Sequence, residues 1–278
     1  MRLHDVANRF NNMVCWDGYT GLHLFNGQLG LYDDNKRDSE TAERRTLSLA
    51  PTAVIPARRV IMAAGMRFIV GHGNPDDWMG STIRMGYAVH EASYLSQVRT
   101  LSEACLGLPG YTAYAGRAWV KDLSYTQQSS KETPEHHIHF SRTEAVAVNQ
   151  LVTFEGRLNL VRSINQGAGG TLVTTCEEVA EPAIESALLL IGTFDPIADT
   201  IVGSPIEITV VRMRWQSLFT YSNSIAPKFQ PGDIQVAIAK SVGTVKAGAV
   251  LTLSDGSWLV ESVVSEGSVW LCRATSHG

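Results

Sequence analysis

One short pattern recurs three times in this chain, and the recurrence constrains the fold more than any single motif does. An apolar segment, a turn glycine and a second apolar run occur around Gly65, Gly156 and Gly256. Apolar runs on both sides of a turn glycine indicate two strands joined in a hairpin, where glycine takes a positive φ at little steric cost. The sequence therefore predicts the same β-hairpin three times.

A second glycine follows each hairpin, at Gly80, Gly170 and Gly267, and a further apolar run follows each of these. Each unit then forms a meander of short strands whose second turn varies. Another strand candidate lies upstream of each meander. Because closure removes exposed strand edges, about four to five strands per unit favour a small barrel. We expect a mainly β chain with three tandem small β-barrel modules.

The segments that connect the units suggest short helical linkers. Residues 177–192 suggest a helix beginning near Pro182, and residues 3–14 suggest another. In residues 91–108 apolar side chains recur at roughly helical spacing, at Leu95, Val98, Leu101 and Cys105. The predicted modules are 1–108, with its N-terminal helix and helical linker, then 109–186, then 187–278.

Composition limits the classes of function. A chain of 278 residues with 44% hydrophobic and 18% charged residues can bury a core. Its apolar runs are too short to span a bilayer and its opening is charged, so we expect an intracellular protein outside the membrane. The net charge of −4 disfavours tight, sequence-reading nucleic-acid binding. Four cysteines without a CxxC pair predict reduced thiols.

The densest group of metal-ligating residues is the sequence EHHIHF, with His136, His137 and His139. On a strand, His137 and His139 share a face, which is a spacing that zinc sites use. No second group in the sequence stands out to complete a ligand shell. We therefore expect solvent-facing or interface histidines and neither metal nor cofactor; a pH-sensitive contact between subunits is a further option.

Motifs that carry catalysis are missing from the sequence. There is no GxSxG motif and no phosphate-binding GxxxxGK[ST] motif. Cys176 and Cys272 lie in apolar strand candidates, where a small buried residue is the ordinary explanation. The sequence therefore predicts a protein that is not an enzyme.

Residues 137–179 resemble the head-tail connector proteins of tailed bacteriophages, especially head-closure or stopper proteins. In that family a strand pair around a turn glycine is followed by a strand that ends near an acidic pair. Residues 231–275 resemble the same kind of module. Family members are usually single barrels, so three modules are a departure. The resemblance implies SH3-like barrels with long loops, assembled into a ring around the DNA channel below the portal.

This resemblance implies a virion structural protein of the neck, assembled in the host cytoplasm. Its partners would be further copies of itself, portal or adaptor proteins, tail proteins, and DNA that passes without sequence-specific binding. The segment 125–136, which we expect to connect the first and second strands of its module, would face the channel or a neighbouring subunit. Polar loops lack the apolar residues that offset ordering entropy, which makes them candidates for ordering by a partner. The candidate assembly residues in these loops are Asp38, Glu40, Lys131, Glu132 and Lys228.

Two other functions remain open from the sequence. One is a phage tail or tail-tip protein that binds a receptor or carbohydrate. The other is a metal-dependent hydrolase that would use His137 and His139.

Overall fold

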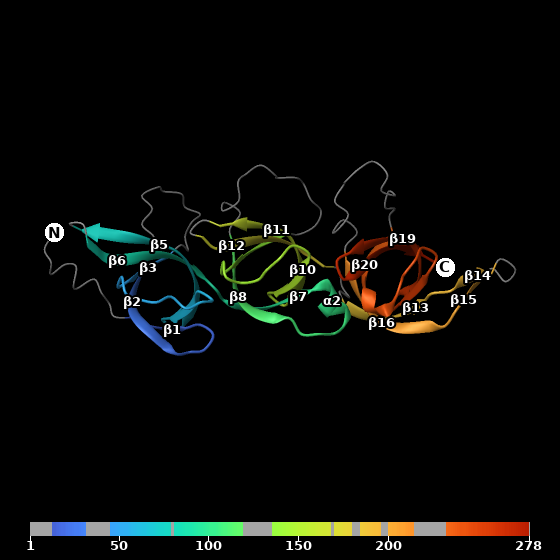
Figure 1. Cartoon of the computed structure of the whole chain (residues 1–278), viewed down its shortest axis with the longest axis horizontal. Helices are drawn as coiled ribbons and strands as arrows, with labels where there is room; N and C mark the ends of the chain where they lie inside the picture. The colour runs from blue at the N-terminus through green and yellow to red at the C-terminus, as the bar shows by residue number, and fades with distance from the viewer. Residues whose placement is uncertain are drawn as a thin grey trace. The chain divides into compact units, whose positions relative to one another are not determined.

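The computed structural model describes residues 13–31, 45–78, 81–118, 135–167, 170–179, 184–195, 200–213 and 232–277, and all structural statements concern these residues. The described chain is mainly β and contains three closed barrels of six strands each (Figure 1). This confirms the predicted mainly β chain of three tandem barrels. Among the described residues, no helix has the length and hydropathy that crossing a membrane would require.

The first barrel consists of β1 (Met13–Asp17), β2 (His23–Leu31), β3 (Arg45–Leu49), β4 (Val60–Ala63), β5 (Met66–Trp78) and β6 (Ser81–Glu91). The middle barrel consists of β7 (Tyr94–Thr100), β8 (Tyr111–Arg117), β9 (Glu135–Phe140), β10 (Gln150–Phe154), β11 (Arg157–Gln166) and β12 (Leu172–Glu178), with helix α2 (Leu101–Cys105) between β7 and β8.

The third barrel consists of β13 (Ile184–Leu190), β16 (Pro205–Met213), β17 (Ile234–Ala239), β18 (Val250–Leu253), β19 (Gly256–Glu266) and β20 (Val269–Ser276). A short 3-10 turn, η2 (Lys240–Val242), follows β17. A separate hairpin of β14 (Thr193–Asp195) and β15 (Thr200–Val202) lies between its first and second strands.

All three barrels have the same topology. When the strands of each barrel are numbered one to six along the chain, the neighbours around the barrel are one, two, three, six, five and four in every case. Strands pair antiparallel in each barrel, as in β1–β2 and β4–β5, β10–β11, and β13–β16, β16–β17 and β18–β19. The predicted meander is strands four to six of each barrel, so the repeat in the sequence marks a repeat in the structure.

The chain divides into two compact units, which are described separately. Unit 1 comprises Met1–Ser96, Thr112–Ala147 and Ser163–Cys176; unit 2 comprises Gln97–Tyr111, Val148–Arg162 and Glu177–Gly278. Unit 1 thus holds the first barrel together with β9 and most of β8 and β12. Unit 2 holds the third barrel together with α2 and the β10–β11 hairpin.

The turn glycines act as predicted in two of the three hairpins. Ala64 and Gly65 have φ values of 50° and 77°, and Glu155 and Gly156 have 51° and 78°. Positive φ at both central residues is the geometry whose twist matches paired strands. In the third hairpin the turn is shifted by one residue, because Gly256 already pairs with Leu253.

Two predicted helices are strands wholly or in part. In residues 91–108, β7 occupies Tyr94–Thr100 and only Leu101–Cys105 is helical. From Leu95 onward the side chains alternate between exposed and buried: Leu95 is exposed, whereas Ser96 and Val98 are buried. An alternation every second residue is the pattern of a strand, not of a helix. The helix begins at Thr100, whose side chain accepts a hydrogen bond from the Glu103 N–H at 3.1 Å in a capping box.

The helix predicted near Pro182 is wrong. Ile184–Leu190 is the strand β13, which pairs with β16 on one side and β18 on the other. Ala187 and Leu189 are buried while Leu188 is exposed, as expected for a strand with one face toward a core. Two pairing partners override the helix propensity of this segment. The helix predicted at residues 3–14 lies largely outside the described residues.

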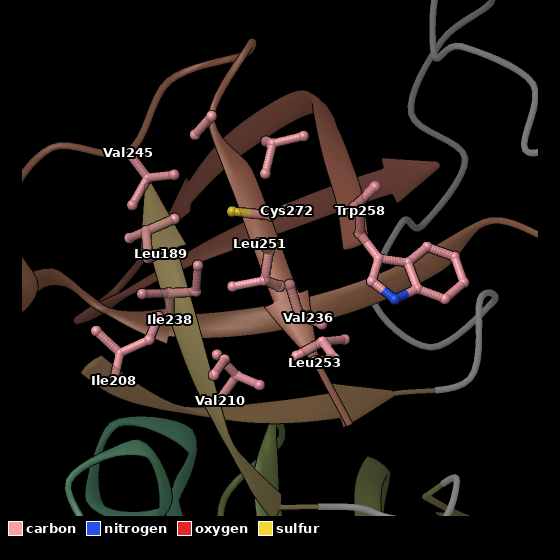
Figure 2. Close-up of a cluster of buried hydrophobic side chains, with 14 of the residues drawn as sticks. Leu189, Ile208, Val210, Val236, Ile238, Val245, Leu251, Leu253, Trp258 and Cys272 are labelled. Atoms are coloured by element: carbon pink, nitrogen blue, oxygen red, sulfur yellow. The ribbon is translucent and has the colours of Figure 1, made fainter. Parts of the chain in front are cut away.

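Apolar side chains fill the interior of the third barrel. Figure 2 shows this for the third barrel, where Leu189, Val210, Val236, Ile238, Leu251 and Cys272 come together from different strands. Ile238, Leu251 and Cys272 have no solvent exposure. Burial of this kind supplies most of the stability of a small barrel. The interior of the third barrel is therefore a packed core rather than a passage.

Candidate functional site

All five predicted assembly residues lie outside the described part of the chain. These are Asp38, Glu40, Lys131, Glu132 and Lys228. The segment 125–136 is described only at its last two positions, where β9 begins. It connects the second and third strands of the middle barrel, not the first and second as predicted, because β7 precedes β8 in that barrel.

The two candidate metal ligands pack against other strands. His139 is almost fully buried; its Nδ1 lies 3.0 Å from Thr171 Oγ1. Its ring stacks on the ring of His90 in β6, with centroids 4.3 Å apart. His137 Nδ1 lies 3.4 Å from Thr175 Oγ1. In the part of the chain that the structure describes, no group of three or more His, Cys, Asp or Glu side chains could hold a metal ion.

All four cysteines are buried free thiols. Burial raises the pKa of Cys15 and Cys105 from 9.0 to about 11. It raises the pKa of Cys176 and Cys272 to about 12. Since the thiolate is the nucleophile and the metal ligand, these thiols are poor candidates for either role at neutral pH.

We expect the native protein to resist thiol modification. Incubation with a chromogenic disulfide reagent at neutral pH should label none of the four cysteines within minutes, because the sulfurs are both buried and protonated. Denaturant should expose all four to rapid labelling. A thiol that reacts fast in the native protein would contradict the burial described above.

The repeated structural feature with the most bearing on function is an outward-facing apolar pair on strands four and five. In the first barrel this pair is Val60 opposite Ile69, and in the middle barrel it is Leu151 opposite Leu160. The two pairs lie at the same distance from their turns. All four side chains are essentially fully buried although they point away from their own barrel core.

The first pair is buried against β8 of the middle barrel, within unit 1. Val60, Ile69 and Ala92 cluster with Tyr19 and Tyr114. The rings of Tyr19 and Tyr114 have centroids 4.9 Å apart, and the guanidinium of Arg67 lies 4.5 Å from the centre of the Tyr114 ring. We call this contact the first joint.

A cluster of polar side chains around Glu144 borders the first joint. Glu144 accepts hydrogen bonds from Arg58 Nε at 3.0 Å, Arg58 Nη2 at 2.8 Å and Tyr19 Oη at 2.9 Å. Tyr19 Oη also accepts from the Tyr114 N–H at 2.9 Å. Burial raises the pKa of Tyr19, which keeps its hydroxyl a neutral donor to Glu144. Directional bonds of this kind fix the orientation of the joint.

Gly116 on β8 allows the close approach at the first joint. A Cβ built on Gly116 would overlap the carbonyl oxygen of Glu91, at the end of β6. Gly86, by contrast, would place a Cβ no closer than 3.7 Å to another atom, which is ordinary contact.

Gly116→Ala should therefore lower the free energy of unfolding of unit 1, which contains the first joint, by about 2 kcal/mol, the usual cost of overpacking. Gly86→Ala, in a strand of the same unit, should change it by no more than about 0.5 kcal/mol. Urea unfolding of both variants measures the difference. Equal effects would mean that the β6 and β8 contact is not tight.

At the second joint, within unit 2, strands four and five of the middle barrel pack against the third barrel, as strands four and five of the first barrel pack at the first joint. Leu151, Leu160 and helix α2 bury the outward faces of β16, β17 and β20. The helix contributes the Cys105 thiol, whose Sγ lies 3.3 Å from the Ala237 carbonyl oxygen. The third-barrel residues in this cluster are Val211, Met213, Ala237, Ala239, Val269 and Leu271.

The same backbone hydrogen bond ends the last strand of all three barrels. Ala92 donates to the Arg67 carbonyl at 2.8 Å in the first barrel, and Val179 donates to the Leu158 carbonyl at 2.9 Å in the middle barrel. Ala92 and Val179 are both buried in the joints. In the third barrel the donor is the exposed His277, whose N–H lies 2.8 Å from the Ser257 carbonyl.

A signal for these joints was present in the sequence. The strands that precede Gly65 and Gly156, Val60–Ala63 and Gln150–Phe154, are near-continuous apolar runs rather than strict alternations. Such runs are typical of strands that are buried on both faces.

The chain does not match any family model, any curated protein or any solved structure.

Proposed function

We propose that the chain is a structural subunit of a tailed-bacteriophage virion, a head-tail connector or neck component that forms a homo-oligomeric ring around the DNA channel. The observation that carries the proposal is the repeated barrel, joined twice through one face. A chain of barrels joined in this way can hold two binding partners at a fixed distance from each other, which is a structural role. In this proposal the barrels are SH3-like and the protein performs no chemistry.

Two further features support the assembly role. The third barrel has a packed interior, so a channel for DNA would have to lie between copies of the chain. The net charge of −4 suits a wall along which DNA slides without sticking. The partners would be portal or adaptor proteins above the ring and tail proteins below it.

The three long polar segments of the sequence also support it. Each falls between the second and third strands of its barrel, at 32–44, 119–134 and 214–231. The barrels are alike while these segments differ, as expected when loops carry recognition on a constant scaffold. We therefore place the contacts with portal, tail and neighbouring subunits on these segments.

Negative-stain imaging and mass photometry of the full chain, alone and with the portal encoded in the same genome, test the proposal. We expect ring-shaped class averages on the portal. The double variant Lys131→Ser with Glu132→Ser should weaken ring or portal binding at least tenfold. The matched control is Arg157→Ser with Glu178→Ser, which removes one charge of each sign from an exposed pair on the same barrel.

The control variant should assemble as the unmodified chain does. A chain that joins neither portal nor tail proteins would sink the proposal. Stoichiometric binding of a glycan by a compact trimer would instead favour the tail-tip function.

A further inference from the structure

In the third barrel, the apolar face equivalent to those buried at the two joints is partly exposed among the described residues. Its outward pair on strands four and five is Val250 opposite Leu259, at the positions that Leu151 and Leu160 occupy in the middle barrel. Val250 and Leu259 are half-buried, whereas the earlier pairs are essentially fully buried. Leu188 on the adjacent strand β13 is 46% exposed on the same side. We call these three residues the end face.

The connection after the first strand gives a second, independent indication. In the first barrel this connection carries Tyr19, which packs on Tyr114 at the first joint. In the middle barrel it is helix α2, which packs on β16 and β17 at the second joint. In the third barrel it is the hairpin β14–β15, which extends away from its barrel and leaves Val202 62% exposed (Figure 1).

The first barrel offers the complementary surface. At the joints, the receiving strands two and three present outward pairs that are buried: Gly116 opposite His139 in the middle barrel, and Val211 opposite Ala237 in the third. The corresponding pair in the first barrel is Gln28 opposite Ser48, and both side chains are half-buried. Gly86 on β6 pairs with Ser48. Because glycine has no side chain, another chain can approach the backbone closely at this point.

From this continuity we propose that the chain associates head to tail, with the end face and hairpin β14–β15 of one copy seated on the β2–β3–β6 face of the first barrel of a second copy. The contact repeats between molecules the joint that the chain makes twice within itself. Because the two surfaces differ, the contact is heterologous and leads to a closed ring or an open chain of copies. Like the proposed function, this inference requires copies of the chain to associate with one another. It depends on no other part of the proposed function.

Within the chain each joint is helped by a covalent connection, which supplies an effective concentration of the order of millimolar. Between copies that help is missing, so we expect association to be weak and concentration-dependent. Sedimentation velocity of the full chain should be measured from about 1 μM up to about 1 mM, where the protein concentration reaches the effective concentration of a linked joint. The average sedimentation coefficient should rise over this range.

Single-face variants identify the surfaces. Leu259→Asp on the end face and Ser48→Arg on the receiving face should each weaken self-association at least tenfold. Val264→Asp is the matched control, since Val264 is a 41% exposed apolar residue at the other end of β19. It should associate like the unmodified chain. Circular dichroism confirms folding, and Val250→Asp replaces Leu259→Asp if the latter is unfolded.

Mixing the two variants gives the decisive result. Leu259→Asp retains a receiving face and Ser48→Arg retains an end face, so an equimolar mixture should form a heterodimer and nothing larger. The proposal is overturned if the unmodified chain stays monomeric throughout, or if Leu259→Asp associates normally. It is also overturned if Ser48→Arg associates normally, because the partner of the end face would then not be the first barrel. The portal takes no part in this test, so the proposed function can fail or hold independently.

Discussion

Leu160→Ala is expected to lower the free energy of unfolding of unit 2 by about 3 kcal/mol, within the range measured for buried leucines. Leu160 points out of its own barrel, yet it is essentially fully buried between β10, α2 and the third barrel. Truncation removes its apolar contacts and leaves a cavity at the second joint. Urea unfolding followed by tryptophan fluorescence measures the change, and hydrogen exchange of β17 reports whether the loss is local to the joint.

The repeat supplies a matched control for this prediction. Leu259 occupies the equivalent position in the third barrel but is only half-buried. Leu259→Ala should therefore cost less than about 1 kcal/mol, because less surface leaves water at this site on folding. If both substitutions cost the same, the burial of Leu160 does not depend on the third barrel, and the second joint as described would be wrong.

Asp233→Ala should lower the free energy of unfolding of unit 2 by about 3 to 4 kcal/mol, the usual cost of breaking a buried ion pair. Asp233 Oδ2 accepts hydrogen bonds from Arg273 Nε at 2.7 Å and Nη2 at 2.6 Å. The two side chains are only 4% and 7% exposed. Without the carboxylate, the guanidinium remains in a site where its charge is poorly solvated. Chemical denaturation of the purified variant measures the loss.

Arg157→Ala is the control for the ion-pair prediction. Arg157 pairs with Glu178 at 2.8 Å, but its side chain is 58% exposed. Solvent screens such a pair, so the substitution should cost less than about 1 kcal/mol. Asp233→Asn should lie between the two, since it keeps one acceptor but loses the charge. A loss for Asp233→Ala as small as that for Arg157→Ala would show that Arg273 is readily solvated.

Local signals predicted the strands and turns well where the residues alone fix the conformation. Gly65 and Gly156 take positive φ in tight hairpins, and Gly170 and Gly267 take positive φ in the next turn of their meanders. Glycine has no Cβ to penalise these conformations, so its position carries information that does not depend on the rest of the fold.

Helix predictions failed where strand pairing decided the conformation. The segment Ile184–Leu190 has residues that favour a helix, but it closes the third barrel by pairing on both edges. Likewise Tyr94–Thr100 pairs with β10 in the middle barrel. Pairing partners far along the chain cannot be read from a local window, and the hydrogen bonds they offer outweigh an intrinsic preference.

The site predictions show the same division. His137 and His139 share a strand, as the sequence suggested, but His139 packs on His90 and Thr171, far away in the sequence. The outward pairs Val60–Ile69 and Leu151–Leu160 were not singled out, although continuous apolar runs signalled burial on both faces. A sequence can indicate that a face is buried without indicating what covers it.

The sequence by itself determined a mainly β chain, three repeats and the turns that define them, because hairpin geometry depends on a few adjacent residues. Only the tertiary structure decided the strand order, the joints and the role of Gly116. That glycine takes no positive φ; it is required because β6 of one barrel passes too close for a Cβ on β8 of the next. Contact between distant strands sets that requirement, and no local pattern encodes it.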